Sequence, residues 1–136
     1  MRINISNLEK AVESLAVALK ACDNSPHRED SVERELMRDG AIQRFEYTFE
    51  LSWKMLKRYL KEYSLERVNL LTNRDLFRVG YEQGMLRDAE AWLDFLKKRN
   101  LTSHTYNATT AKVVYQSAQY FLQDARFLLD RLRERI

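Results

Sequence analysis

The feature of this sequence that most constrains its fold is the scarcity of residues that interrupt helices. The 136 residues include three glycines and one proline, and no proline follows Pro26. A sheet protein of this size would need more turn-forming residues between its strands. The sequence therefore predicts an all-α protein. A chain of this length fits one domain, residues 1–136, and is long enough to bury a sizeable core.

Hydrophobic residues that recur at steps of three and four predict five helices. The second helix carries a broad apolar stripe, which can face two neighbours at once. Two long helices joined to shorter ones by short links favour an antiparallel up-and-down bundle of the four-helix type. The expected helices span about 6–22, 31–63, 72–84, 88–100 and 106–134. The stripe consists of Ile42, Phe45, Phe49, Ser52, Leu56, Tyr59 or Leu60, and Tyr63.

Polar residues at the expected helix ends support these boundaries. Ser6 and Glu9 have the spacing of a capping box, in which each side chain satisfies a free backbone N–H. Gly84 suits a C-terminal cap, because glycine accepts the left-handed conformation there. Further candidate N-caps are Asp30 or Ser31, Thr72 and Asp88.

Composition narrows the classes of function. The net charge of +3, from 23 basic and 20 acidic residues, falls well short of a surface that coats nucleic acid, yet is compatible with a local phosphate site. The single cysteine, Cys22, forms neither an internal disulfide nor a thiolate metal cage, and we expect it to be a small buried hydrophobe. Residues 1–10 hold no long apolar run, and no stretch approaches the roughly 20 apolar residues of a membrane span. We expect a cytoplasmic protein without membrane segment, metal or cofactor.

The segment RNLTSHTYN, residues 99–107, lies between the last two expected helices and holds one of the two histidines. On an unbroken helix, Arg99 and His104 would point about 140° apart. Asn100 tolerates the left-handed conformation that ends a helix, and Thr102 or Ser103 can cap the next one. The predicted turn lets Arg99 and His104 point into one cleft, which a tyrosine joins from the first turn of the last helix.

Two interpretations of this segment remain open. In the first, Arg99 offers a fixed fork of donors to phosphate, and His104 moves protons during cleavage of a phosphodiester without a metal. One histidine is few for acid–base chemistry, but a symmetric dimer with the turn at its two-fold axis would supply a second copy of both residues. In the second, the segment is a polar corner, where Asn100 caps, Arg99 meets the helix dipole and His104 hydrogen-bonds locally.

The sequence RNLTSHTY resembles the R-x4-6-H motif, in its H-x-Y form, of the HEPN superfamily (higher eukaryotes and prokaryotes nucleotide-binding). Arg99, His104 and Tyr106 match its three named positions, and Asn100 matches the polar residue often found after the arginine. Two longer blocks resemble one branch, the nucleotidyltransferase substrate-binding proteins: IQRFEYTFELSWKMLKRYL at 42–60 and EAWLDFLKKRNLTSHTYN at 90–107.

The resemblance implies a helical bundle that forms homodimers, with the motif beside the dimer cleft, and a minimal nucleotidyltransferase as partner. Members from toxin–antitoxin pairs resemble metal-independent endoribonucleases, which the partner silences by AMPylation of the motif tyrosine, here Tyr106. An older description makes the chain the subunit that presents substrate to the transferase. Arg99 and His104 are then the catalytic candidates, and Asn100, Tyr106 and Glu46 are secondary binding candidates.

The chain itself lacks the signature of a nucleotidyltransferase. Its glycines precede Ala41, Tyr81 and Met85, so it has no Gly-Ser turn to cradle phosphate, and it has no Walker A loop. Nucleotidyl transfer must therefore come from a partner.

Three hypotheses about function remain. The chain is a dimeric binding module that offers a nucleotide or Tyr106 to a transferase, a ribonuclease acting on RNA, or a purely structural helical protein. The first two need the same motif residues. Glu46 also has a plainer interpretation, in which it and Glu50 belong to a solvated helix face answered by Lys54, Lys57 and Arg58 at helical spacing.

Overall fold

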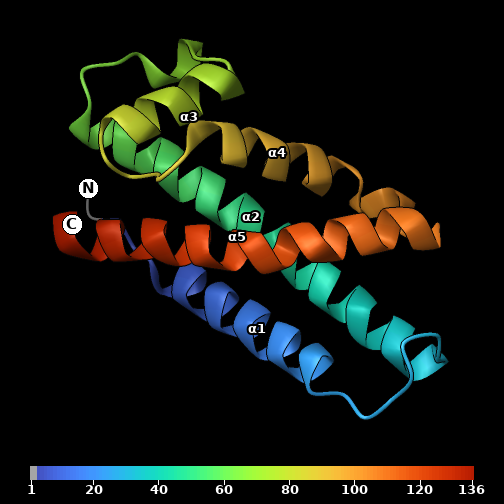
Figure 1. Ribbon diagram of the computed structural model, residues 1–136. Helices are drawn as coiled ribbons and strands as arrows, with labels where there is room; N and C mark the ends of the chain where they lie inside the picture. Colours follow the sequence, from blue (N-terminus) through green and yellow to red (C-terminus); the bar gives the residue numbers. More distant parts are fainter. Residues whose placement is uncertain (1–2) are drawn as a thin grey trace.

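The computed structural model describes residues 3–136, and its secondary structure is helical (Figure 1). All five expected helices are present, each within two residues of its expected bounds. The prediction of an all-α helical bundle is confirmed, while the homodimer stays a prediction. In chain order the elements are α1 (Ser6–Asp23), α2 (Val32–Tyr63), the 3-10 helix η1 (Val68–Leu70), α3 (Asn73–Glu82), α4 (Ala89–Asn100), the 3-10 helix η2 (Thr102–His104) and α5 (Ala108–Arg135).

Helix α2 is the central element of the bundle. Helix α1 packs antiparallel along its first half, and α5 crosses both. Figure 1 shows α5 across the middle of the molecule, with α1 on one side and the α3–α4 pair on the other. Helix α4 runs antiparallel to α5, and η2 contacts α2, α4 and α5. The turn between α4 and α5 is therefore packed against three helices rather than detached from the bundle.

The apolar stripe of α2 forms the centre of the core, as predicted. Its members Ile42, Phe45, Phe49, Ser52, Leu56, Tyr59 and Leu60 are buried. Only the final member, Tyr63, departs from the prediction: it lies at the last residue of α2 and is exposed. Cys22 is buried at the end of α1, which confirms its expected role as a small hydrophobe.

An aromatic cluster joins α2, α4 and α5. Phe121 of α5 lies at its centre, with its ring centroid 5.3 Å from that of Phe45 and 5.7 Å from that of Phe49. From α4, Trp92 and Phe95 approach the same ring at 5.4 and 5.1 Å. All five side chains are nearly or fully buried. Edge-on and tilted pairs of this kind add to the free energy of burial.

Most of the predicted helix caps are confirmed, but the capping box at the start of α1 is wrong. Ile5 occupies the N-cap position, where its side chain cannot accept a hydrogen bond. The amide of Ser6 instead donates to Asn4 Oδ1 at 2.9 Å, and Glu9 forms an ion pair with Arg133 of α5 at 2.8 Å. The confirmed N-caps, each accepting from the backbone N–H three residues on, are Ser31, Thr72 and Asp88.

Gly84 ends α3 with a positive φ of 77°. The amide of Met85 donates to the carbonyl of Gly80 at 2.8 Å, and the amide of Gly84 donates to the carbonyl of Tyr81 at 2.9 Å. This pair of bonds is a Schellman motif, which satisfies carbonyl groups left free at a helix end. The predicted glycine cap is confirmed.

Substitution of Gly84 and of Gly40, two of the three glycines, by alanine should change the free energy of unfolding in opposite directions. Gly84→Ala should lower the free energy of unfolding by about 1–2 kcal/mol, because a Cβ is disfavoured in the left-handed region. Gly40→Ala, inside α2, should raise it by about 0.5–1 kcal/mol, since alanine is the better helix former and the new Cβ meets only the flexible end of Arg44 at 3.3 Å. Urea denaturation of both variants measures the difference; two changes of the same sign would contradict the backbone argument.

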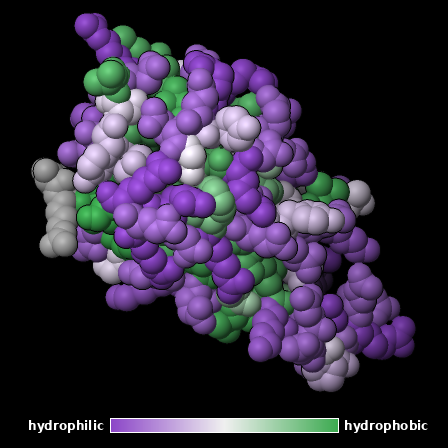
Figure 2. All heavy atoms as spheres, turned by 60° about the vertical axis from the view of Figure 1, so that its left-hand side comes forward, coloured by the Kyte–Doolittle hydropathy of each residue, from purple (hydrophilic) through white to green (hydrophobic). Residues whose placement is uncertain are grey.

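The surface is mainly hydrophilic on the face that Figure 2 displays, with apolar residues in separate patches. Large apolar side chains that are exposed include Val32, Leu36, Tyr47, Val113 and Tyr120. Within residues 3–136, every helix is too short or too polar to cross a membrane.

Candidate functional site

Residues 99–107 form a compact turn between α4 and α5. The amide of His104 donates to the carbonyl of Leu101 at 2.9 Å, which closes the 3-10 turn of η2. Two hydroxyls add local bonds: Thr102 donates to the carbonyl of Arg99 at 2.8 Å, and Thr105 donates to the carbonyl of Thr102 at 3.2 Å. The turn therefore has a defined shape, which fixes the direction of the side chains it carries.

The turn is made differently from the prediction. Asn100 is the last residue of α4 and does not end it in a left-handed conformation, since no non-glycine residue of 3–136 has a positive φ. Thr102 and Ser103 do not cap α5; Asn107 does, and its side chain accepts from a backbone N–H of the first turn at 3.1 Å. Thr102 is not available to cap α5 because its hydroxyl donates to the carbonyl of Arg99, one of the carbonyl groups left free at the end of α4.

Arg99 is held by a carboxylate from the middle of α2. Its Nε lies 2.7 Å from Glu50 Oε1, and both side chains are about one-third exposed, 31% for Arg99 and 36% for Glu50. The N–H of Nε is not aligned on that oxygen, so the contact is an ion pair rather than a linear hydrogen bond. The terminal nitrogens of Arg99 donate no hydrogen bond within residues 3–136, so their donors are available to a ligand.

His104 and Tyr106 lie together on the outer side of the turn. Their ring centroids are 6.1 Å apart and their planes meet at 73°, an edge-on arrangement. His104 is exposed, and 86% of the surface of Tyr106 is accessible. The sequence predicted Tyr106 in the first turn of the last helix. In the structure it precedes the N-cap of α5 and lies outside that helix. No hydrogen bond or ion pair joins this pair to Arg99 within the described chain.

The acidic partner of Arg99 is Glu50 and not Glu46. Glu46 is half-buried one turn earlier on α2, and among residues 3–136 it forms no hydrogen bond or ion pair. Glu50 had been assigned only to a solvated helix face, so sequence reasoning missed its role. The spacing of the two carboxylates was visible, but which one faces Arg99 depends on how α4 crosses α2.

The polar-corner interpretation explains only part of this geometry. It requires Asn100 to cap, Arg99 to serve the helix dipole and His104 to form a local side-chain hydrogen bond. Asn100 is an exposed helical residue, and the His104 side chain has no hydrogen-bond partner in the described part of the chain. The corner is held instead by threonine hydroxyls and backbone bonds. The side chains of His104 and Tyr106 are therefore not needed to build it, whereas Arg99 ties the end of α4 to α2.

Comparisons with known proteins find similarity along nearly the whole chain. The family described as "Nucleotidyltransferase substrate binding protein like" matches residues 3–134. A relative from Haemophilus influenzae named "Probable ribonuclease HepT" is 33% identical over 138 residues, which cover 98% of this chain and 94% of the relative.

Two solved structures are also similar. One, from Haemophilus influenzae, is described as revealing the fold of a substrate binding domain of a nucleotidyltransferase; it has 30% identity and a TM-score of 0.87, over 96% of this chain and 99% of that one. A protein of Thermus thermophilus has 35% identity and a TM-score of 0.72, over 93% of this chain and 98% of that one.

Proposed function

Because this chain belongs to the nucleotidyltransferase substrate binding protein-like family, we propose that it is the HEPN-type partner subunit of a minimal nucleotidyltransferase. In this proposal the Arg99, His104 and Tyr106 motif binds a nucleotide or RNA phosphate, and Tyr106 accepts AMP. The active form is a homodimer with the motif beside its cleft. The transferase is a separate protein that forms a heteromeric complex with this dimer.

The observation that carries this proposal is the presentation of Tyr106. Its side chain is 86% exposed, and its hydroxyl has no hydrogen-bond partner among residues 3–136. It lies on a turn whose backbone is fixed by local bonds, between η2 and the Asn107 cap of α5. A second enzyme can therefore reach the hydroxyl without unfolding any part of the bundle.

The chemistry of the transfer would be divided between the two proteins. The Tyr106 oxygen attacks the α-phosphorus of a nucleoside triphosphate, a new phosphorus–oxygen bond forms, pyrophosphate leaves, and the phenol proton passes to a base or to solvent. The transferase supplies the phosphate-binding Gly-Ser turn, which the sequence of this chain lacks, together with the acidic residues that hold magnesium. Arg99 and His104 lie on the same turn and would contact the transferred phosphate.

Tyr106→Phe should abolish AMP addition without changing the fold. The variant removes only the accepting oxygen from an exposed ring, so its thermal unfolding should match that of the parent chain. The measurement is the intact mass of the protein after co-expression with the nucleotidyltransferase encoded beside it. The parent should gain the mass of one or more adenylyl groups, and Tyr106→Phe should gain none.

Tyr120→Phe is the matched control for this experiment. Tyr120 is also exposed, at 63%, but lies farther along α5 and outside the motif. It should be modified as the parent is. An adenylyl group found on Tyr120, or retained by Tyr106→Phe, would overturn the assignment of Tyr106. Failure of the parent to bind the transferase would overturn the partner-subunit function itself.

A second candidate function is a metal-independent endoribonuclease of a toxin–antitoxin pair. The specific observation in its favour is the relative named "Probable ribonuclease HepT", whose similarity covers 98% of this chain. The arrangement of Arg99 also supports it, because Glu50 lies against Nε and the terminal nitrogens donate no hydrogen bond within residues 3–136. A bidentate guanidinium is well suited to an oxyanion.

In this second function the motif residues would act on the scissile phosphate. Arg99 holds the phosphate while His104 takes the proton from the 2′-hydroxyl, whose oxygen attacks phosphorus. The bond to the 5′-oxygen breaks, and the His104 of a second copy across the dimer cleft protonates the leaving oxygen. The products are a 2′,3′-cyclic phosphate and a 5′-hydroxyl, and DNA is inert because it lacks the nucleophile.

A further inference from the structure

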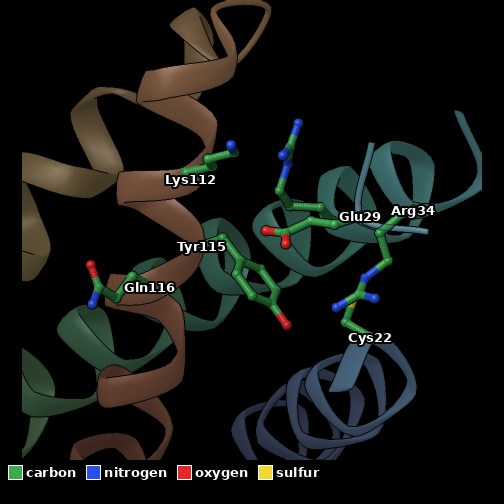
Figure 3. Close-up of a pocket in the computed structure, with 7 residues that line it drawn as sticks. Cys22, Glu29, Arg34, Lys112, Tyr115 and Gln116 are labelled. Carbon is green, nitrogen blue, oxygen red and sulfur yellow. The ribbon is translucent and has the colours of Figure 1, made fainter. Parts of the chain in front are cut away.

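A second site of unusual composition lies at the end of the bundle where α1 finishes and α2 and α5 begin. It is a pocket of about 270 Å³, which we call the α1–α2–α5 pocket (Figure 3). Its lining comes from residues 22–38, which span the end of α1, the loop and the start of α2, and from residues 112–116 of α5. The lining residues are Cys22, Glu29, Arg34, Arg38, Lys112, Tyr115 and Gln116.

The pocket gathers three cations that have no carboxylate partner. Within residues 3–136, none of Arg34, Arg38 and Lys112 forms a salt bridge. The single hydrogen bond among them is a long one, from Arg34 Nη1 to the carbonyl of His27 at 3.5 Å. Elsewhere most arginines pair with acids, as Arg28, Arg74, Arg78, Arg87, Arg99, Arg131 and Arg133 do. The cations of the pocket therefore lack direct ion pairs, and Arg38 acts on the carboxyl of the adjacent Asp39 only through a longer-range charge interaction.

Arg38 gives the strongest indication of a missing ligand. Its Nε is excluded from solvent and has no hydrogen-bond partner. A buried donor that lacks an acceptor costs free energy, particularly when the group is charged. An oxyanion bound in the pocket would supply that acceptor and would offset the positive charge.

The other polar groups of the pocket do not neutralise these cations. Burial raises the pKa of the Cys22 thiol and that of the Tyr115 phenol, so both are uncharged at neutral pH. The Tyr115 hydroxyl donates to Asp23 at 3.4 Å, on the α1 side. The acidic side chain in the lining is Glu29, which is exposed on the loop before α2 and points into the pocket in Figure 3.

We propose that the α1–α2–α5 pocket binds the phosphomonoester group of a small organic phosphate. Arg34, Arg38 and Lys112 hold the phosphate, while the ring of Tyr115 contacts the organic part; the amide of Gln116 points to the other side of α5 in Figure 3. The volume supports an organic body, because about 270 Å³ is close to the lower end of small-molecule pockets, about 300 Å³. A single phosphate ion would leave much of this space to water.

This site is distinct from the motif and goes beyond the proposed function. Arg38 and Glu50 are twelve residues apart on α2, which places them roughly 18 Å apart along the helix axis. Glu50 marks the position of Arg99, since the two form an ion pair. A molecule in the α1–α2–α5 pocket would therefore occupy a separate position along α2 and would not compete directly for Arg99.

Calorimetric titration of the full chain with AMP tests this proposal, with adenosine and inorganic phosphate as the other ligands. AMP should bind, and adenosine should bind at least about tenfold more weakly because it lacks the charge-assisted bonds. Phosphate should bind in the same place but more weakly than AMP. Two variants should each lower the affinity for AMP at least about tenfold. They are Arg38→Met, which keeps the apolar stem, and Lys112→Ala, at an exposed position. Glu29→Gln should strengthen AMP binding by removing the competing carboxylate.

Lys61→Ala is the control for general surface charge. Lys61 is exposed and belongs to a different basic hollow, which Lys54 and Lys57 also line. It should leave AMP affinity within about twofold of the parent, as expected for a rim charge outside the site. Equal binding of AMP and adenosine, or equal losses in Lys61→Ala and Lys112→Ala, would overturn the proposal.

Amide chemical shifts locate the bound AMP and separate this proposal from the proposed function. The largest changes should fall at Cys22, Lys112 and Tyr115, and Arg38→Met should suppress them. Changes centred on residues 99–107 would overturn the pocket while leaving the motif function intact. Binding of the transferase, measured separately, reports on the partner-subunit function alone.

Discussion

Phe121→Ala is expected to remove a large share of the stability of this protein. Removal of a fully buried phenylalanine costs about 3–5 kcal/mol through lost burial and the cavity left behind. Its ring contacts four other aromatic side chains, and the space lies between α2, α4 and α5, where no single helix can collapse into it. The total free energy of unfolding of a domain is typically about 5–15 kcal/mol. The midpoint of thermal unfolding should therefore fall by about 10–18 °C.

Tyr120→Ala is the matched control for this change. It removes an aromatic ring from the neighbouring residue of the same helix, but one that is 63% exposed. Its cost should be within about 0.5 kcal/mol, as for other surface substitutions. Urea denaturation of both variants at the same protein concentration measures the difference. A loss of less than about 1 kcal/mol for Phe121→Ala would show that the aromatic cluster is not the centre of the core.

The fold was predictable because its signals are local. The steps of three and four in the apolar stripe of α2, and cap residues such as Ser31, act within one helix, and one turn of neighbouring sequence is enough to read them. The capping box predicted at the start of α1 is wrong because a contact with a distant part of the chain competes with the local one. Ser6 and Glu9 have the right spacing, but Asn4 engages Ser6 and Arg133, from the far end of the chain, engages Glu9. A distant partner of this kind leaves no trace in the local sequence.

The position of the turn was predicted, but its contacts were missed. Residues 99–107 alone indicate a turn between α4 and α5, whereas the exposure of Tyr106, which was expected inside a cleft, is visible only in the structure. The pairing of Arg99 with Glu50 depends on the crossing of α4 over α2, so the sequence indicated no acidic partner for Arg99 and singled out Glu46 instead as a secondary binding candidate. The α1–α2–α5 pocket was missed for the same reason, because residues 112–116 of α5 meet residues 22–38 only in the folded chain.

His104→Ala should abolish RNA cleavage if the second candidate function holds. General acid–base groups contribute about 10²–10⁴-fold to rate, and a dimer built on one motif would lose both of its proton carriers in a single substitution. The fold should survive, since the His104 side chain is exposed and makes no hydrogen bond in the described part of the chain. The measurement is the rate of cleavage of an RNA oligonucleotide in the presence of a chelator, together with growth on expression without the transferase.

The other histidine of the chain provides the control. His27 lies in the loop between α1 and α2, and its side chain is exposed like that of His104. His27→Ala removes the same imidazole, so it should cleave RNA and arrest growth as the parent does. Equal loss in both variants would mean that cleavage follows the number of histidines or a contaminant rather than the motif. A parent chain that leaves RNA intact and growth unaffected, yet binds the transferase, would reject the ribonuclease and retain the partner subunit, because Tyr106 needs no catalytic histidine to accept AMP.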